Sequence, residues 1–194
     1  MTGTCFKLAA PTRPARDALL AWLMGLEDTL SGIWAEARYA GVLAELRAAA
    51  GGHVAIAFED GGLLRSLDAW QNAMLPVAFH DAQELEAAGW RARGILAAAG
   101  HRPKEFAGRA DATLSLYERR LLGFVKAMLV EPQLLVVDRL FEDLGFEESR
   151  AVAGWLRLFR SRYPLRRILY VGLTEAAPEL LAGFAPLISM EKVQ

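Results

Sequence analysis

Between Leu114 and Asp138 the chain reads LSLYERRLLGFVKAMLVEPQLLVVD. Apolar residues recur at helical spacing over 116–130, and Glu131-Pro132 then interrupts the pattern. The next residues, Leu134–Val137, are all aliphatic, which is typical of a central parallel strand that is buried on both faces. This stretch therefore predicts a helix followed by a buried strand that ends at an acidic side chain.

The same alternation of strand and helix runs through the rest of the chain. Short apolar runs predict strands, and longer runs with helical spacing predict helices. Strands that alternate with helices indicate an α/β fold with a mostly parallel central sheet. The predicted strands cover 4–9, 53–58, 134–137 and 168–171, and the predicted helices cover 15–26, 67–79, 82–99, 116–130 and 149–160.

Length and composition predict a single domain over residues 1–194, because 54% of the residues are hydrophobic and can form a sizeable core. The 22 Lys and Arg are balanced by 23 Asp and Glu, so the chain lacks the basic excess of a nucleic-acid binder.

Cys5 is the only cysteine and the three histidines are scattered, so we expect no disulfide and no metal site. The apolar runs are shorter than the roughly 18–20 residues of a membrane-spanning helix. We therefore expect a cytoplasmic protein that does not itself insert into a membrane.

The stretch from Leu114 to Asp138 resembles the ATPase subunits of ABC transporters. In that family a signature Leu-Ser-Gly-Gly-Gln opens a helix, and the Walker B aspartate ends an aliphatic strand at a fixed distance from the signature serine. Asp138 follows Ser115 by the family's 23 residues. The signature-like residues here are Leu114, Ser115, Leu116, Tyr117 and Glu118.

The rest of the chain falls into the same register. Residues 10–17 take the place of the phosphate-binding loop, whose pattern is G-x-x-x-x-G-K-[ST]. Glu59 takes the place of the Q-loop glutamine, Arg139 that of the catalytic glutamate, and Leu173 that of the switch histidine. The resemblance implies a P-loop NTPase-like ABC ATPase fold. Its α/β core would comprise 1–60 and 131–194, its helical subdomain about 61–130, and its N-terminal antiparallel section would be shortened.

The phosphate-binding residues of this family are altered in residues 10–17. Ala10 and Ala15 replace the glycines that allow a tight curl, and Pro14 removes one amide donor. Arg16 replaces the lysine and Asp17 the hydroxyl residue, while Arg13 lies within the loop. We therefore expect no cofactor, or weak binding of ATP and Mg²⁺ at most, with Asp17 and Asp138 as the carboxylates available to the metal.

The hydrolytic residues are altered as well. Arg139 cannot accept a proton from water, so general-base catalysis from this position is excluded. The side chains of Leu116, Tyr117 and Glu118 would crowd the γ-phosphate of a partner, where the family has Gly-Gly-Gln. We expect no catalytic residue in this chain.

Three functions remain open from the sequence. The first is an inactive ABC ATPase homologue, a pseudo-ATPase bound to a membrane permease, an active ABC ATPase or a second copy of itself. Gly61–Phe79, with Trp70, Met74 and Leu75, would then be part of a docking face or of the core, and its pattern is most similar to importer and lipid-trafficking members. The second is a divergent ATP-binding subunit that a partner ATPase completes. The third is a ligand-binding α/β protein with a remodelled pocket.

The altered phosphate loop also predicts an internal ion pair. In the family fold the loop lysine and the Walker B aspartate lie on adjacent strand ends, around one phosphate and one Mg²⁺. Without these ligands, Arg16 and Asp138 would face each other across a partly buried gap. We therefore expect Arg16 to pair with Asp138, and with Asp17 beside it.

Overall fold

The computed structural model describes residues 4–80, 82–106, 108–173, 181 and 183–186. The chain forms two compact units. The sheet unit comprises Met1–Ile56, Pro132–Arg139 and Tyr163–Gln194, and the helical unit comprises Ala57–Glu131 and Leu140–Arg162. Each unit is built from segments that are distant in sequence, so neither could be assembled from one continuous stretch of chain.

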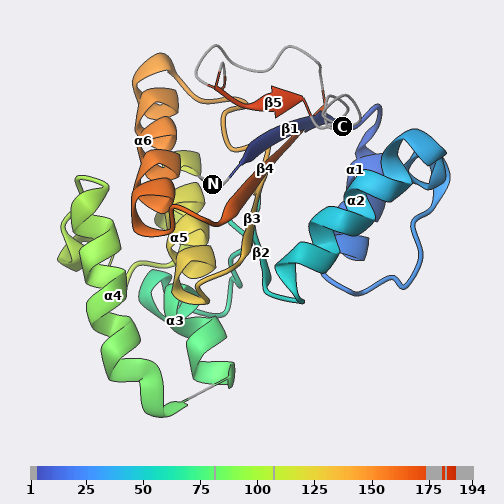
Figure 1. Cartoon of the computed structure of the whole chain (residues 1–194). Coiled ribbons are helices and arrows are strands. Elements are labelled where there is room, and N and C mark those ends of the chain that lie inside the picture. Colours follow the sequence, from blue (N-terminus) through green and yellow to red (C-terminus); the bar gives the residue numbers. More distant parts are fainter. Residues whose placement is uncertain (1–3, 81, 107, 174–180, 182, 187–194) are drawn as a thin grey trace. The chain divides into compact units, whose positions relative to one another are not determined.

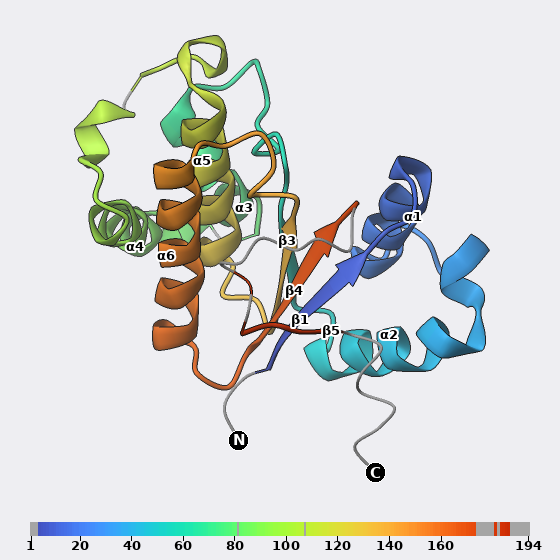
Figure 2. The same cartoon turned by 90° about the horizontal axis from the view of Figure 1, so that it is seen from above.

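The sheet has the strand order β2-β3-β4-β1-β5. The pairs β1 with β4, β3 with β4 and β1 with β5 are all parallel (Figure 2). Cys5–Ala9, which directly precedes the position of the phosphate loop, therefore belongs to the parallel sheet. The strands are β1 (Cys5–Ala9), β2 (Val54–Ala57), β3 (Leu134–Asp138), β4 (Arg167–Gly172) and β5 (Ala185–Pro186).

Two helices, α1 (Arg13–Leu23) and α2 (Ala37–Ala50), lie on one face of this sheet, with the short 3₁₀ helix η1 (Gly32–Ala35) between them in sequence (Figure 1). Helix α1 begins where the Thr12 side chain accepts a hydrogen bond from the Ala15 amide, and Pro14 occupies its first turn. It ends shortly before Gly25, whose φ of 76° is incompatible with a continuing helix. The predicted helix over 15–26 is therefore real but begins and ends earlier.

Helix α2 was not expected from the sequence. Its buried side chains, Tyr39, Leu43, Leu46 and Ala50, recur at helical spacing. The alanines and the glycine between them obscure this apolar face, because they are also common in exposed helical positions. Gly51 ends the helix in the left-handed region, with a φ of 56°.

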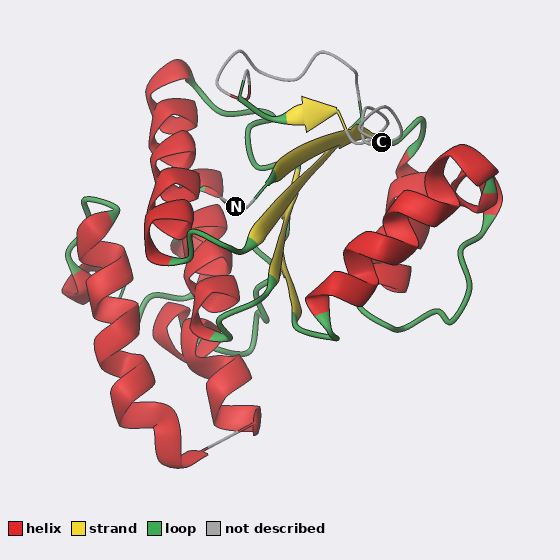
Figure 3. Ribbon diagram, in the orientation of Figure 1, coloured by secondary structure: helices red, strands yellow, loops and turns green. Residues whose placement is uncertain are grey.

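The described residues of the helical unit form four α-helices, which are among the helices coloured red in Figure 3. Helix α5 packs against α3, α4 and α6, and α3 also packs against α4. All four were predicted, although α6 begins three residues before the expected Ser149. No helix in the described part of the chain is long and apolar enough to span a bilayer. The elements are α3 (Ala69–His80), η2 (Ala82–Glu84), α4 (Leu85–Ala98), η3 (Pro103–Glu105), η4 (Asp111–Thr113), α5 (Leu116–Leu129) and α6 (Phe146–Arg162).

Candidate functional site

The carboxyl ends of three parallel strands meet at one edge of the sheet. Ala9 is paired with Gly172 and Asp138 with Val171, so β1 and β3 end level with each other on either side of β4. The same edge is extended by hydrogen bonds from the Ala10 amide to the Gly172 carbonyl and from the Arg139 amide to the Val171 carbonyl. Open parallel sheets carry their sites at such an edge. The expectation that the phosphate loop and Asp138 follow adjacent strands is wrong, because β4 lies between β1 and β3.

Residues 13–17, in the second half of the expected phosphate loop, belong to helix α1. Helix α1 already begins at Arg13, where a phosphate-binding loop would still be curling around its ligand. The Arg16 amide donates to the Thr12 carbonyl at 3.0 Å, and the Ala15 amide donates to the Thr12 hydroxyl at 3.3 Å. Pro14 has no amide hydrogen to offer. The backbone donors of Ala15 and Arg16 are therefore already engaged by the chain itself.

The Arg16 side chain extends to the end of β3 and binds Asp138 with two hydrogen bonds. Its Nε and Nη2 atoms lie 2.8 and 2.7 Å from the two carboxylate oxygens. Asp138 is fully buried and Arg16 is 8% exposed, so this fork-shaped contact is shielded from water. Nη1 of Arg16 also lies 3.4 Å from the exposed carboxylate of Asp17. The predicted pairing of Arg16 with both aspartates is confirmed.

The first turn of α1 is also held by a residue that the sequence did not single out. Trp34, in η1, is almost completely buried, and its indole Nε1 donates to the Ala15 carbonyl at 2.6 Å. Its ring contacts Tyr39 edge to face, with centroids 5.2 Å apart. A lone tryptophan in a short turn gives no sequence signal, because the contact depends on how η1 packs against α1.

The other predicted nucleotide-pocket residues of the sheet unit differ in how far they are buried. Ala10 and Arg139 are buried, Ala15 and Leu173 are half-buried, and Arg13 is exposed. The backbone of Arg139 has a φ of 52°, in the left-handed region that residues other than glycine seldom adopt. Thr174, which follows Leu173 in the switch position, lies outside the described residues.

In the helical unit, Ser115 and Glu118 cap the start of α5. The Ser115 hydroxyl accepts a hydrogen bond from the Glu118 amide at 3.1 Å, and the Glu118 carboxylate accepts one from the Ser115 amide at 2.7 Å. This is a reciprocal capping box. Leu114, which precedes it, is buried.

The Glu118 carboxylate is held in place by Arg109. The two Nη atoms of Arg109 lie 2.5 and 3.0 Å from its two oxygens. Arg109 also donates to the Thr113 carbonyl at 2.6 Å, so the pair fixes the turn that precedes α5. The amino end of the signature-like helix thus carries an internal carboxylate close to its exposed amides, where the helix dipole favours negative charge.

Tyr117 contacts side chains of its own unit. Its ring lies against Trp155 of α6, with centroids 5.1 Å apart, and its hydroxyl is 3.2 Å from Nε2 of His101. Burial, assisted by the Glu148 carboxylate, raises the pKa of the Tyr117 hydroxyl. The side chain therefore packs within the helical unit, and its effect on the nucleotide of a partner stays a prediction.

The Arg109–Glu118 pair predicts a pH-dependent stability. Hydrogen bonding to Arg109 lowers the pKa of Glu118, against the opposing effect of burial. A lowered pKa stabilises the fold above the ordinary glutamate pKa, and this contribution is lost as the pH falls through the folded-state value. We expect Glu118→Gln to cost about 1–2 kcal/mol at pH 7, because the pair is charged but partly exposed.

Urea unfolding at a series of pH values would measure this effect. The difference between Glu118→Gln and the unmodified protein should shrink as the pH falls below about 4, since protonated Glu118 no longer pairs as an anion. Glu147→Gln is the matched control, because the Glu147 side chain is 81% exposed. A difference between Glu118→Gln and the unmodified protein that is independent of pH would contradict the prediction.

The residues at the sheet edge fit Mg²⁺ and a nucleotide phosphate poorly. A phosphate needs converging amides and a free cation, but the Ala15 and Arg16 amides and the Arg16 guanidinium already have partners inside the chain. Asp138, which would have to face the metal, is bound on both oxygens by Arg16. Among the described residues, no three His, Cys, Asp or Glu side chains are grouped closely enough to hold a metal ion.

Comparison with known proteins supports homology to the ATP-binding subunits of ABC transporters. The chain is 25% identical over 182 residues to the sulfate/thiosulfate import ATP-binding protein CysA of Nephroselmis olivacea. The match covers 92% of the chain and 50% of that protein, so the chain spans about half the length of this relative. No family model matches the chain.

The fold is that of an ABC ATPase. The chain superposes with a TM-score of 0.61 on CbiO1 of Clostridium perfringens, described as part of the ABC transporter complex CbiONQ. The superposition covers 89% of this chain and 68% of CbiO1, at 14% sequence identity. The α/β fold with a parallel sheet and accompanying helices, expected from the sequence, is confirmed.

Proposed function

We propose that this chain is an inactive ABC ATPase homologue that serves as a structural or regulatory subunit of a membrane transport complex. The observation that carries the proposal is the buried ion pair between Arg16 and Asp138, at the place where the family binds nucleotide phosphate and Mg²⁺. To bind Mg-ATP as the family does, the chain would have to break this pair and unwind the first turn of α1. Both steps cost free energy, so they oppose nucleotide binding.

The residues that follow the two central strands support the same proposal. In β3, Asp138 is followed by Arg139, a permanent cation that cannot deprotonate an attacking water. After β4, Leu173 offers no group that could bind a phosphate or move a proton. Loss of one general base alone lowers rates by about 10²–10⁴-fold.

We expect Mg-ATP to leave the melting temperature of the isolated protein unchanged. A ligand that binds the native state stabilises it by RT ln(1 + [L]/Kd), about 4 kcal/mol when the ligand is present at a thousand times Kd. Millimolar ATP acting on a micromolar site would therefore raise the melting temperature by several degrees. A thermal-shift titration measures this directly, with Asp138→Ala to identify any shift that does not arise at the sheet edge.

Steady-state hydrolysis should likewise be undetectable, and Arg139→Glu alone should not restore it because the phosphate site remains altered. A partner ATPase could still complete the site, which is the second function left open by the sequence. A large thermal shift with Mg-ATP that is lost in Asp138→Ala would favour that function. Turnover at an ordinary family rate by the isolated protein would refute the proposed inactivity.

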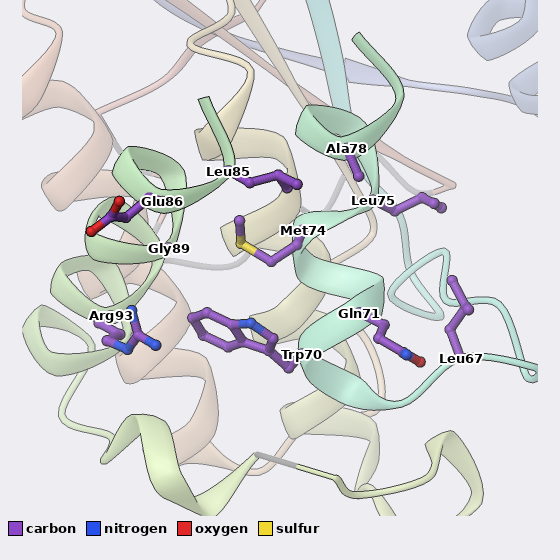
Figure 4. Close-up of a pocket in the computed structure, with 10 residues that line it drawn as sticks. All are labelled: Leu67, Trp70, Gln71, Met74, Leu75, Ala78, Leu85, Glu86, Gly89 and Arg93. Carbon is purple, nitrogen blue, oxygen red and sulfur yellow. The ribbon is translucent and has the colours of Figure 1, made fainter. Parts of the chain in front are cut away.

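A surface suited to a partner lies between α3 and α4 in the helical unit (Figure 4). Trp70 and Met74 face it from α3, and the Arg93 guanidinium lies over the Trp70 ring, 4.9 Å from its centroid. Two large side chains of the same helices are strongly exposed, Phe79 at 83% and Trp90 at 67%. The lining residues are Leu67, Trp70, Gln71, Met74, Leu75, Ala78, Leu85, Glu86, Gly89 and Arg93.

We propose this groove as the place where a membrane permease docks. The groove is mainly apolar and carries one cation, Arg93, and one carboxylate, Glu86. It therefore fits a short helix that carries large apolar side chains and charges complementary to these two. The sequence left Gly61–Phe79 open between a docking face and core, and this segment holds both buried and exposed side chains. Met74 is largely buried, whereas Phe79 is exposed.

Membrane fractionation in cells that express the full chain and its permease would test the groove. We expect the chain to sediment with membranes, and the double change Leu75→Ser and Leu85→Ser, at two apolar residues that line the groove, to release most of it. The control is Phe146→Ser with Leu165→Ser, which removes two exposed apolar side chains, at 72% and 73%, that do not line the groove. Equal sedimentation of both double variants with membranes would count against docking here.

A further inference from the structure

A buried arginine in α5 joins two segments of the helical unit that are distant in sequence. Arg120 is 2% exposed, and its guanidinium donates to backbone carbonyls on both sides. Nε binds the Glu59 carbonyl at 2.6 Å, while Nη1 binds the carbonyls of Leu140, at 3.3 Å, and Glu142. One side chain thus links the segment after β2 with the segment after β3.

The segment after β2 is held against α5 at two further points. Gly61 approaches α5 so closely that a Cβ atom on it would lie 2.4 Å from the Arg119 carbonyl oxygen, and one on Gly123 would lie 2.6 Å from the Gly61 oxygen. One turn further along α5, Nζ of Lys126 donates to the Gly62 carbonyl at 2.9 Å. Partial burial lowers the pKa of Lys126, against the opposing effect of Asp60.

Helix α3 fixes the other end of the same connection. Asn72 is fully buried, and its amide group donates to the carbonyls of Leu64, Leu67 and Asp68, at 3.0, 3.1 and 3.1 Å. Its side-chain oxygen accepts from the Leu64 amide at 2.6 Å. The connection 59–68 is therefore fastened to α5 at one end and to α3 at the other.

We infer that Arg120 is a positioning residue that couples 59–62 to 140–142, so that the two segments open and close together. The five donors of a planar guanidinium are spread over three nitrogens in a fixed geometry, so they can bind carbonyls of two segments at once, whereas the three donors of lysine come from a single nitrogen. Without Arg120, carbonyls on both segments would lose a charged partner, and both segments would become easier to open. This coupling lies within the helical unit and does not depend on whether the chain binds nucleotide.

Amide hydrogen exchange, followed peptide by peptide, tests the coupling. In the unmodified protein, peptides covering 59–62 and 140–143 should share one opening constant. Arg120→Met should raise the exchange of both peptides by the same factor, at least tenfold, while peptides from β3 and β4 stay unchanged. Arg119→Met is the matched control on the same helix, because Nε of Arg119 is buried without a hydrogen-bond partner in the described structure.

The possible outcomes separate coupling from general stabilisation. If Arg120→Met accelerates exchange throughout the chain by one factor, or in only one of the two segments, the inference is wrong. If the variant does not fold, the opening constants of the two segments in the unmodified protein still test the coupling. Different opening constants for the two segments, or exchange of 59–62 as fast as that of the exposed turn at Gly51 and Gly52, would refute the coupling.

Discussion

Arg16→Ala should lower the free energy of unfolding by about 3–5 kcal/mol, a large part of the stability of a domain of this size. The reason is the burial of Asp138, which would remain in the interior without the guanidinium that binds both of its oxygens. Asp138→Ala should have an effect of similar size, because it leaves the Arg16 charge buried beside β3. Urea denaturation monitored by circular dichroism would measure both.

The double variant distinguishes this explanation from a general loss of packing. Removal of both charges leaves no buried ion, so the cost of the double change should be smaller than the sum of the single changes, by about 1–3 kcal/mol. Arg38→Ala provides the control, because Arg38 and Glu36 form an ion pair at 2.9 Å whose side chains are about half exposed. That change should cost less than about 1 kcal/mol. Additive effects of Arg16→Ala and Asp138→Ala would mean that the pair does not stabilise the fold as a unit.

The sequence predicted those parts of the fold that depend on local patterns. The aliphatic run before Asp138 and the helical spacing after Ser115 identify β3 and α5 because burial and helical periodicity are both visible in the residues themselves. Helix α2 was missed because alanines mask its apolar face. The order of the strands is a long-range property, and the position of β4 between β1 and β3 is not encoded in any single stretch.

The same distinction applies to the candidate site. The Arg16–Asp138 pair could be predicted, because the family resemblance places two opposite charges at one ligand site and a buried charge needs a partner. Arg120 and Asn72 could not, because their partners are backbone carbonyls, which every residue has. Their contacts depend on how closely α5 and α3 approach the connection 59–68, and that distance cannot be predicted from the residue types.

Because α5 lies so close to the connection 59–68, an alanine at Gly123 would meet backbone atoms of that connection. Gly123 lies inside α5, where alanine normally stabilises a helix by about 1 kcal/mol relative to glycine. A Cβ atom at this position would lie 2.6 Å from the Gly61 oxygen and 2.9 Å from the Gly61 Cα, and both are backbone atoms. Backbone fastened by Arg120 and Lys126 cannot move away easily, so the steric cost should exceed the gain in helix propensity.

We therefore expect Gly123→Ala to destabilise the protein by about 1–3 kcal/mol or more, the range found for overpacked interiors. Gly94→Ala should have the opposite sign, because Gly94 lies in α4 with no atom within 4 Å of an added Cβ, and only the gain in helix propensity of about 1 kcal/mol remains. Thermal unfolding of the two variants side by side measures the contrast. If Gly123→Ala raised the melting temperature as Gly94→Ala does, the close contact between α5 and Gly61 would not exist in solution.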